Sequence, residues 1–104
     1  MKKILFLMVA FGAAAFAAEA DVANQTLKAY SMIAAGVGLG LAALGGAIGM
    51  GNTAAATIAG TARNPGLGGK LMTTMFIALA MIEAQVIYTL VIALIALYAN
   101  PYLG

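Results

Sequence analysis

The chain has 104 residues, 64% of them hydrophobic, and carries only five Lys or Arg and three Asp or Glu. A soluble domain usually has about a quarter of its residues charged, so this composition argues against a soluble enzyme, and the high hydrophobicity argues against disorder. Without Cys or His, and with a net charge of +2, the chain offers no disulfide, no Cys or His site and no nucleic-acid surface. A membrane protein is predicted.

The N-terminal leader resembles a secretory signal peptide. Two lysines precede an apolar run over residues 4–18, and Ala-x-Ala cleavage sites end at Ala17 and Ala20. We expect cleavage after Ala20, which assigns residues 1–20 to a leader. The alternative is an uncleaved anchor helix, for which the run is short.

The most polar stretch follows the leader. Residues 18–28 include Glu19, Asp21 and Lys28. We expect this stretch to lie in water as the terminus of the mature chain, with the membrane segments beginning after it.

Two segments are long and apolar enough to cross a membrane. Residues 29–62 carry no charge, and residues 71–104 carry only Glu83. Each exceeds the roughly 20 residues that a helix needs to span hydrocarbon. The sequence therefore predicts an all-α membrane protein, a two-helix antiparallel transmembrane hairpin over residues 21–104.

The boundaries of that hairpin follow from turn residues. Residues 63–70 combine Pro65 with three glycines, which favours a polar loop between helix one, about residues 29–62, and helix two, about residues 71–99. Helix two should end near Asn100 and Pro101, because proline stops a helix.

Small residues cover two faces of helix one. At about 100° per residue, a bulky stripe runs through Val37, Leu41, Leu44 and Ile48. One flank of the stripe holds Gly38, Ala42, Gly45 and Gly49, and the other holds Gly36, Gly40, Ala43, Ala47 and Gly51. Small residues at four-residue spacing let membrane helices approach closely. Two such faces indicate a like neighbour on each side and a head-to-tail ring; the alternative is the general tolerance of membrane helices for glycine.

The loop charges set the orientation. Arg63 and Lys70 in a short loop favour the cytoplasmic side. A cleaved signal peptide leaves the new N-terminus outside, which independently places the loop inside. We expect both mature termini to be periplasmic.

Glu83 is the one charge in the membrane segments. It lies about 13 residues after Lys70 and about 17 before Asn100, near the middle of the span. An ionised carboxylate there costs about 2.5 kcal/mol or more, and no cation in the spans can pair with it, so hydrocarbon favours the protonated form. This pattern indicates a proton carrier; the alternative is a Glu that hydrogen-bonds a neighbouring helix as glue.

Equal rise in both helices places residue 83 opposite residue 49. We therefore expect the carboxyl to face Gly49 and Gly51 of helix one. Tyr88 is a polar side chain that could support the carboxyl, with plain packing as its alternative. Gln85 points about 200° away from Glu83.

Several features together resemble a known family. The segment Gly45–Gly51, the loop Ala62–Pro65, the mid-helix Glu83 and the ending Leu97–Pro101 are similar to the c subunit, or proteolipid, of bacterial F-type ATP synthases. The resemblance covers roughly residues 32–103. It implies a homo-oligomeric ring in the bacterial inner membrane, with helix one inside and helix two outside.

The same resemblance implies functional roles. Glu83 matches the carboxyl that is protonated and deprotonated once per rotational step, coupling proton flow to ATP synthesis. Arg63, Asn64 and Pro65 match the loop that contacts the gamma and epsilon subunits of the central stalk, although the family commonly has Gln at the position of Asn64. The stator's a subunit would supply an Arg for ionised Glu83. The long leader is unusual for bacterial members.

The ion is expected to be a proton. Sodium-coupled members have Gln at the position of Met50 and Ser or Thr at that of Ala84, and these two residues supply no oxygen ligand for Na⁺. Gln85 leaves an amide oxygen nearby. Neither a metal nor a cofactor is expected. No ATP chemistry is expected in this chain, because it has no phosphate loop and no set of catalytic polar groups.

Two alternatives remain at the level of sequence. A pore-forming or structural membrane hairpin would explain the glycines but would not need Glu83 at the depth of Gly49. A V-type proteolipid would share the carboxylate chemistry, but that family usually has duplicated hairpins.

Overall fold

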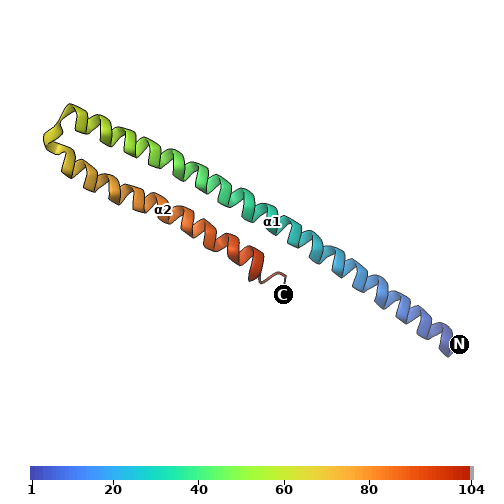
Figure 1. Ribbon diagram of the computed structural model, residues 1–104. Coiled ribbons are helices and arrows are strands. Elements are labelled where there is room, and N and C mark those ends of the chain that lie inside the picture. The colour runs from blue at the N-terminus through green and yellow to red at the C-terminus, as the bar shows by residue number, and fades with distance from the viewer. Residues whose placement is uncertain (104) are drawn as a thin grey trace.

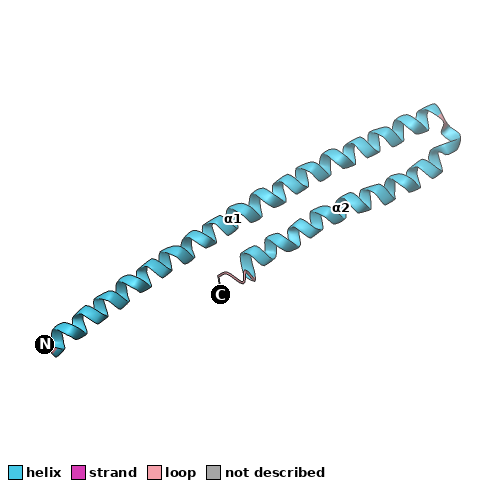
Figure 2. Cartoon of the chain, turned by 180° about the vertical axis from the view of Figure 1, so that it is seen from behind, coloured by secondary structure: helices cyan, strands magenta, loops and turns pink. Residues whose placement is uncertain are grey.

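The protein is a helical hairpin. The computed structural model describes residues 1–103, in which helix α1 (Lys2–Arg63) and helix α2 (Gly68–Tyr98) are joined by a short 3-10 helix, η1 (Pro65–Leu67). The two long helices lie side by side and antiparallel, with no strand among the described residues (Figures 1 and 2). The molecule measures 94 × 16 × 9 Å. The predicted all-α, two-helix antiparallel hairpin is confirmed.

Helix α1 is much longer than the expected range of about 29–62. It runs without interruption from Lys2, through the leader and the polar stretch. The leader is rich in alanine, a strong helix former, and no proline occurs before Pro65, so nothing in the backbone ends the helix. Residues 2–26 are all exposed, and the blue end of α1 projects well beyond the C-terminus of α2 (Figure 1).

The connection is shorter than the expected loop of residues 63–70. Arg63 ends α1, and Asn64 turns the chain with φ −142° and ψ 83°, outside the helical region, which is disfavoured for a residue before proline. The N–H of Leu67 donates to the carbonyl of Asn64 at 3.0 Å. Residues 68–70 belong to α2. A Cβ on Gly68 would lie 3.1 Å from Thr61 Cγ2, so the missing side chain lets α2 start close beside α1.

The contact between α1 and α2, called the seam below, is built on small residues. A Cβ on Gly46 would lie 2.9 Å from Val86 Cγ2, one on Gly49 would lie 3.5 Å from Ile82 Cδ1, and one on Gly60 would lie 3.0 Å from Leu71 Cδ1. Backbones that come this close gain dispersion contacts, which drive helix association in lipid. The seam therefore fixes how the two helices align in depth.

Threonine hydroxyls are satisfied within their own helices. Each donates to the carbonyl four residues earlier at 2.8–3.1 Å, in α1 from Thr26, Thr53, Thr57 and Thr61 and in α2 from Thr73, Thr74 and Thr89. Such bonds remove the need for water. These hydroxyls therefore fit an apolar surrounding.

Helix α2 ends close to the expected position. Tyr98 is its last residue, one before the expected Ala99, whose N–H still donates to Ile95 O at 2.9 Å. Pro101 cannot continue the helix. By length and composition, α1 and the segment Pro65–Tyr98 could each cross a membrane.

Candidate functional site

Glu83 lies on the outside of the hairpin, one residue from the seam. Its neighbour Ile82 faces α1, and Val86, one turn on, does the same. The Glu83 side chain itself is exposed. No Lys or Arg occurs in residues 29–62 or 71–104, so no charge in the apolar parts of the chain can neutralise the carboxylate.

Glu83 lies near the level of Gly49, but within one chain the side chain that faces this glycine is that of Ile82. At the level of Gly49, the three atoms nearest to a built Cβ all belong to Ile82, and a Cβ on Gly51 would meet nothing within 4 Å. The reason is the rotation of about 100° between consecutive residues. Ile82 occupies the seam, so Glu83 must point to one side.

Tyr88 does not approach Glu83 within the same chain. It is 66% exposed, and five residues of helix turn it about 140° away from Glu83. Gln85 is also exposed and lies on the far side of α2 from Glu83. Any support of the carboxyl by these polar groups has to come from a different copy of the chain.

The predicted packing glycines of α1 divide into two groups. Gly49 is in the seam, whereas added Cβ atoms on the others would meet nothing within 4 Å, namely Gly36, Gly38, Gly40, Gly45 and Gly51. The bulky stripe on α1 is open as well, with Val37, Leu41, Leu44 and Ile48 55–63% exposed. One hairpin therefore leaves these small and bulky faces uncovered.

Sequence reasoning missed Gly46 and Gly60 as close contacts. Gly46 makes the closest approach to α2 of any glycine in residues 1–103. Its signal was the pair Gly46 and Gly49, spaced three residues apart and so on one helix face. The four-residue spacing drew attention to Gly45 instead.

The turn presents its residues to the surroundings. Arg63, Asn64 and Pro65 are all exposed at the tip of the hairpin, opposite the end that holds the C-terminus (Figure 1). Only Lys70 adds a further charge nearby. The tip is therefore a basic surface available to another protein.

The open end of the hairpin, opposite the turn, is closed by a polar contact that the sequence did not reveal. The Asn100 amide donates to Ser31 Oγ at 3.1 Å, and the Tyr102 N–H donates to Asn100 Oδ1 at 2.9 Å. Ser31 is 8% exposed. Asn100 and Ser31 are 69 positions apart in the sequence, and no local sequence pattern predicts such a pairing.

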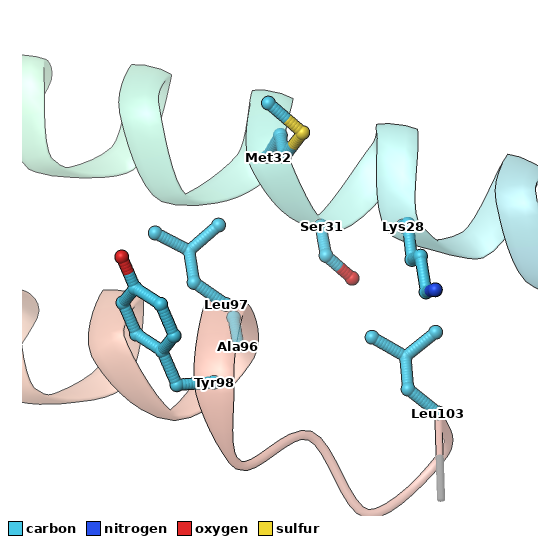
Figure 3. Close-up of a pocket in the computed structure, with 7 residues that line it drawn as sticks. All are labelled: Lys28, Ser31, Met32, Ala96, Leu97, Tyr98 and Leu103. Atoms are coloured by element: carbon cyan, nitrogen blue, oxygen red, sulfur yellow. The ribbon is translucent and has the colours of Figure 1, made fainter.

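A shallow groove adjoins this contact. Figure 3 shows its lining, which is Lys28, Ser31 and Met32 from α1 and Ala96, Leu97, Tyr98 and Leu103 from the C-terminal part of the chain. The groove lies at the open end, several helical turns from Glu83, so it plays no part in the chemistry of that carboxyl.

The chemistry available to the chain is narrow. Among residues 1–103, no group of three or more His, Cys, Asp or Glu side chains comes together. Glu83 alone offers a titratable oxygen pair in the apolar part of the hairpin. Such a group can take up and release a proton.

Comparisons with known proteins match the chain to one family. The model of the family described as the C subunit of ATP synthase matches residues 33–96. Proteins named as the c subunit of ATP synthase are similar over the full length of both chains, with 89% identity in Sulfurimonas denitrificans, 82% in Aliarcobacter butzleri and 79% in Sulfurovum sp. over 104 residues. The similarity to these relatives therefore includes the leader, which lies outside the matched family region.

Proposed function

The chain belongs to the c-subunit family of ATP synthases, and on that premise we propose that Glu83 is the carboxyl whose reversible protonation couples proton flow to rotation. The chain is a membrane protein and a rotor component of the oligomeric ring of F-type ATP synthase. The observation that carries the proposal is the position of Glu83. It is the only charge in the apolar spans, it lies at mid-depth, and its side chain is exposed beside the seam.

A ring of identical hairpins accounts for the uncovered faces of α1. The flank of the bulky stripe that carries Gly49 lies toward α2 of the same chain, whereas the open stripe and the small residues of the other flank remain to accept like neighbours. A head-to-tail contact repeated around an axis closes a ring. Because Glu83 is beside the seam and outside it, its side chain stays accessible at the boundary between copies. Each copy then brings one carboxyl to the same depth.

The proton cycle follows from the cost of charge in hydrocarbon. A proton entering from the periplasmic side neutralises Glu83, and the neutral site can turn into lipid, whereas an ionised one costs about 2.5 kcal/mol or more. After most of a rotation the proton leaves toward the cytoplasm. One charge crossing the membrane gains about 2.3 kcal/mol per 100 mV, so several protons are required for each ATP.

The transported ion is the proton. Na⁺ needs several oxygen ligands, and Met50 on α1 and Ala84 on α2, at the positions where sodium-coupled members of the family carry such ligands, provide none. A proton needs only the carboxyl and one hydrogen-bond partner. Neither a resident metal nor a cofactor has a role in this cycle.

Two partner surfaces complete the assignment. The exposed tip with Arg63, Asn64 and Pro65 contacts the gamma and epsilon subunits of the central stalk on the cytoplasmic side. At the outer rim of the ring, an Arg of the stator's a subunit attracts ionised Glu83. Membrane lipid covers the remainder.

The leader is removed in the mature protein. In the straight α1, the apolar side chains of residues 4–16 would stand far beyond the open end of the hairpin, and Phe6, Phe11 and Phe16 are 72–79% exposed. Cleavage after Ala20 removes this surface and leaves both termini in the periplasm of a bacterium, with the chain in its inner membrane.

The test replaces the carboxyl while keeping its shape. In Glu83→Gln, we expect proton-driven ATP synthesis in membrane vesicles to fall to background, because the amide cannot exchange a proton, while the ring still assembles. The matched control Asp21→Asn, which removes a carboxylate from the polar stretch that stays in the mature chain, should keep full synthesis. Full synthesis in Glu83→Gln would contradict the proposal and favour a structural membrane hairpin.

A further inference from the structure

Asn52 is a polar side chain in the membrane that the hairpin leaves without a partner. It is exposed on α1, in the uncharged segment of residues 29–62, and its amide forms no hydrogen bond within residues 1–103. The neighbouring Thr53, in contrast, donates to Gly49 O at 2.8 Å. An amide without a partner in an apolar medium costs several kcal/mol, so Asn52 should find a partner outside its own chain.

Helix geometry places Asn52 and Glu83 on opposite sides of one hairpin. Gly49 and Ile82 face each other across the seam. Glu83 is turned about 100° from Ile82, and Asn52, three residues after Gly49, is turned about 60° the other way around its axis. Since the helices are antiparallel, these rotations carry the carboxyl to one side of the hairpin and the amide to the other.

The same construction puts Gln85 on the side of Asn52, because it is three residues after Ile82. We call this the amide side and the opposite one the carboxyl side. When identical hairpins are related by rotation about an axis along their length, the carboxyl side of one copy meets the amide side of the next. The contact is head-to-tail and repeats at every boundary.

Depth and side-chain direction agree with a contact across that boundary. Rotation about such an axis changes no residue's depth. Asn52 is about 4.5 Å nearer the turn than Gly49, and Glu83 is about 1.5 Å farther from it than Ile82, so about 6 Å separates them along the axis. Side chains lean toward the N-terminus of their helix, so Asn52 and Glu83 lean toward each other. Gln85 leans toward the turn, as Glu83 does. The difference in depth between Gln85 of one copy and Glu83 of the next is therefore not reduced.

We propose that the Asn52 amide of one copy donates a hydrogen bond to the Glu83 carboxylate of the next copy, as a positioning residue for the proton-carrying group. This inference rests on the proposed ring function of Glu83. A donor at this point favours the ionised carboxylate and holds it at the boundary between copies. On the amide side, the titratable side chain of α2 near this depth is Tyr88, and α1 has no titratable side chain at this depth.

A cross-linking experiment tests the geometry independently of activity. The natural chain has no cysteine, so Asn52→Cys and Glu83→Cys in one chain give a clean background for a short thiol-to-thiol reagent in native membranes. We expect a ladder of cross-linked oligomers and none with either single cysteine. Cross-links confined to one chain, or no ladder, would overturn the proposal.

A labelling experiment tests the effect on the carboxyl. A carbodiimide reacts with the protonated acid, so labelling of Glu83 in the intact ring falls as the pH rises. Loss of one hydrogen bond to the carboxylate in Asn52→Leu should move the half-labelling pH upward by about one unit, with recovery in Asn52→Gln. The matched control Asn24→Leu, far along α1, should leave the curve in place.

The outcomes separate this inference from the proposed function. An unchanged labelling curve in an intact Asn52→Leu ring would overturn the role of Asn52 while Glu83 remained the labelled group. Full ATP synthesis in Glu83→Gln would instead remove the proposed function. If the Asn52→Leu chain forms no ring and the double variant Asn52→Cys with Glu83→Cys gives no cross-linked ladder, Asn52 is a packing residue. That result would also overturn its positioning role.

Discussion

The seam and the two outer sides of the hairpin differ in how tightly their residues pack within one chain. In the seam, small residues such as Gly46 and Gly49 let Val86 and Ile82 pack directly on the backbone of α1, and neighbouring threonine hydroxyls are satisfied within their helices. The outer sides carry open glycines, exposed bulky residues and Glu83. One chain therefore completes its seam but not its sides.

The difference separates the contacts that one chain completes by itself from the surfaces on which its function depends. A seam that is complete within one chain can set the depth of every residue before any neighbour arrives. Sides that are incomplete can be covered only by other copies or by lipid, and the carboxyl lies there. The proton exchange proposed for Glu83 needs that exposure, because a carboxyl enclosed in the seam could not reach water or the proposed cation of the stator.

The largest effect should come from filling the seam. In Gly46→Leu, the first added carbon would already lie 2.9 Å from Val86 Cγ2, so the helices must separate along their length. We expect loss of the detergent-stable oligomer and of ATP synthesis, measured by native electrophoresis and vesicle assay. The double variant Gly46→Ala with Val86→Ala should keep most of the detergent-stable oligomer and most of the ATP synthesis. The change at position 86 removes the methyl group that the added carbon at position 46 would contact. Persistent loss in that pair would argue against the seam.

A smaller loss should come from filling an outer side. In Gly40→Leu nothing within the hairpin is in the way, so helix content by circular dichroism should stay unchanged while oligomer formation fails. Asn24→Leu, at an exposed position in the polar stretch of the mature chain, serves as the control and should assemble normally. Oligomers of normal stability in Gly40→Leu would show that this side does not meet a neighbour.

Ion choice should respond to the composition of the sides. In the natural ring, Na⁺ at high pH should give no protection of Glu83 against carbodiimide, because Met50 and Ala84 bring no oxygen. The double change Met50→Gln and Ala84→Ser should create measurable protection, about twofold or more in labelling rate for a shift of about 0.4 kcal/mol. Protection of the natural ring would instead assign it to sodium.

The smallest effect should come from the open end. In Ser31→Ala the Asn100 amide loses its acceptor at 3.1 Å, and we expect the free energy of unfolding in a detergent titration to fall by about 1 kcal/mol. Thr26→Val removes an exposed hydroxyl that donates a hydrogen bond only within its own helix. This change should lower the free energy of unfolding by less. Equal effects of the two changes would mean that the contact across the hairpin adds no stability.

Much of this fold could be predicted from the sequence, because charge and proline mark ends plainly. The lack of charge in residues 29–62, and in residues 71–104 apart from Glu83, predicted the two helices, and Pro65 predicted the turn. The length of the turn was overestimated, since Gly68 and Gly69 are typical loop residues but belong to α2. At Gly68 the close approach to Thr61 favours glycine inside the helix. The start of α1 was also misjudged, because polarity near Glu19 does not end a helix.

The candidate site was predictable in depth but not in direction. Equal rise along both helices placed Glu83 at the level of Gly49, as the contact of Ile82 confirms. Which of two consecutive residues enters the seam depends on rotation by about 100°, and the sequence pattern does not fix that choice. The pairing of Ser31 with Asn100 depends on the same register and was out of reach for the same reason.

The role of Glu83 as the working carboxyl is tested most directly by chemical labelling of the natural protein. Membranes are treated with a carbodiimide, adducts at Asp21 and Glu83 are quantified by mass spectrometry, and proton-driven ATP synthesis is assayed in parallel. We predict adducts at Glu83 alone, with synthesis lost as that fraction grows. Synthesis that continues while Glu83 is fully modified would contradict this role.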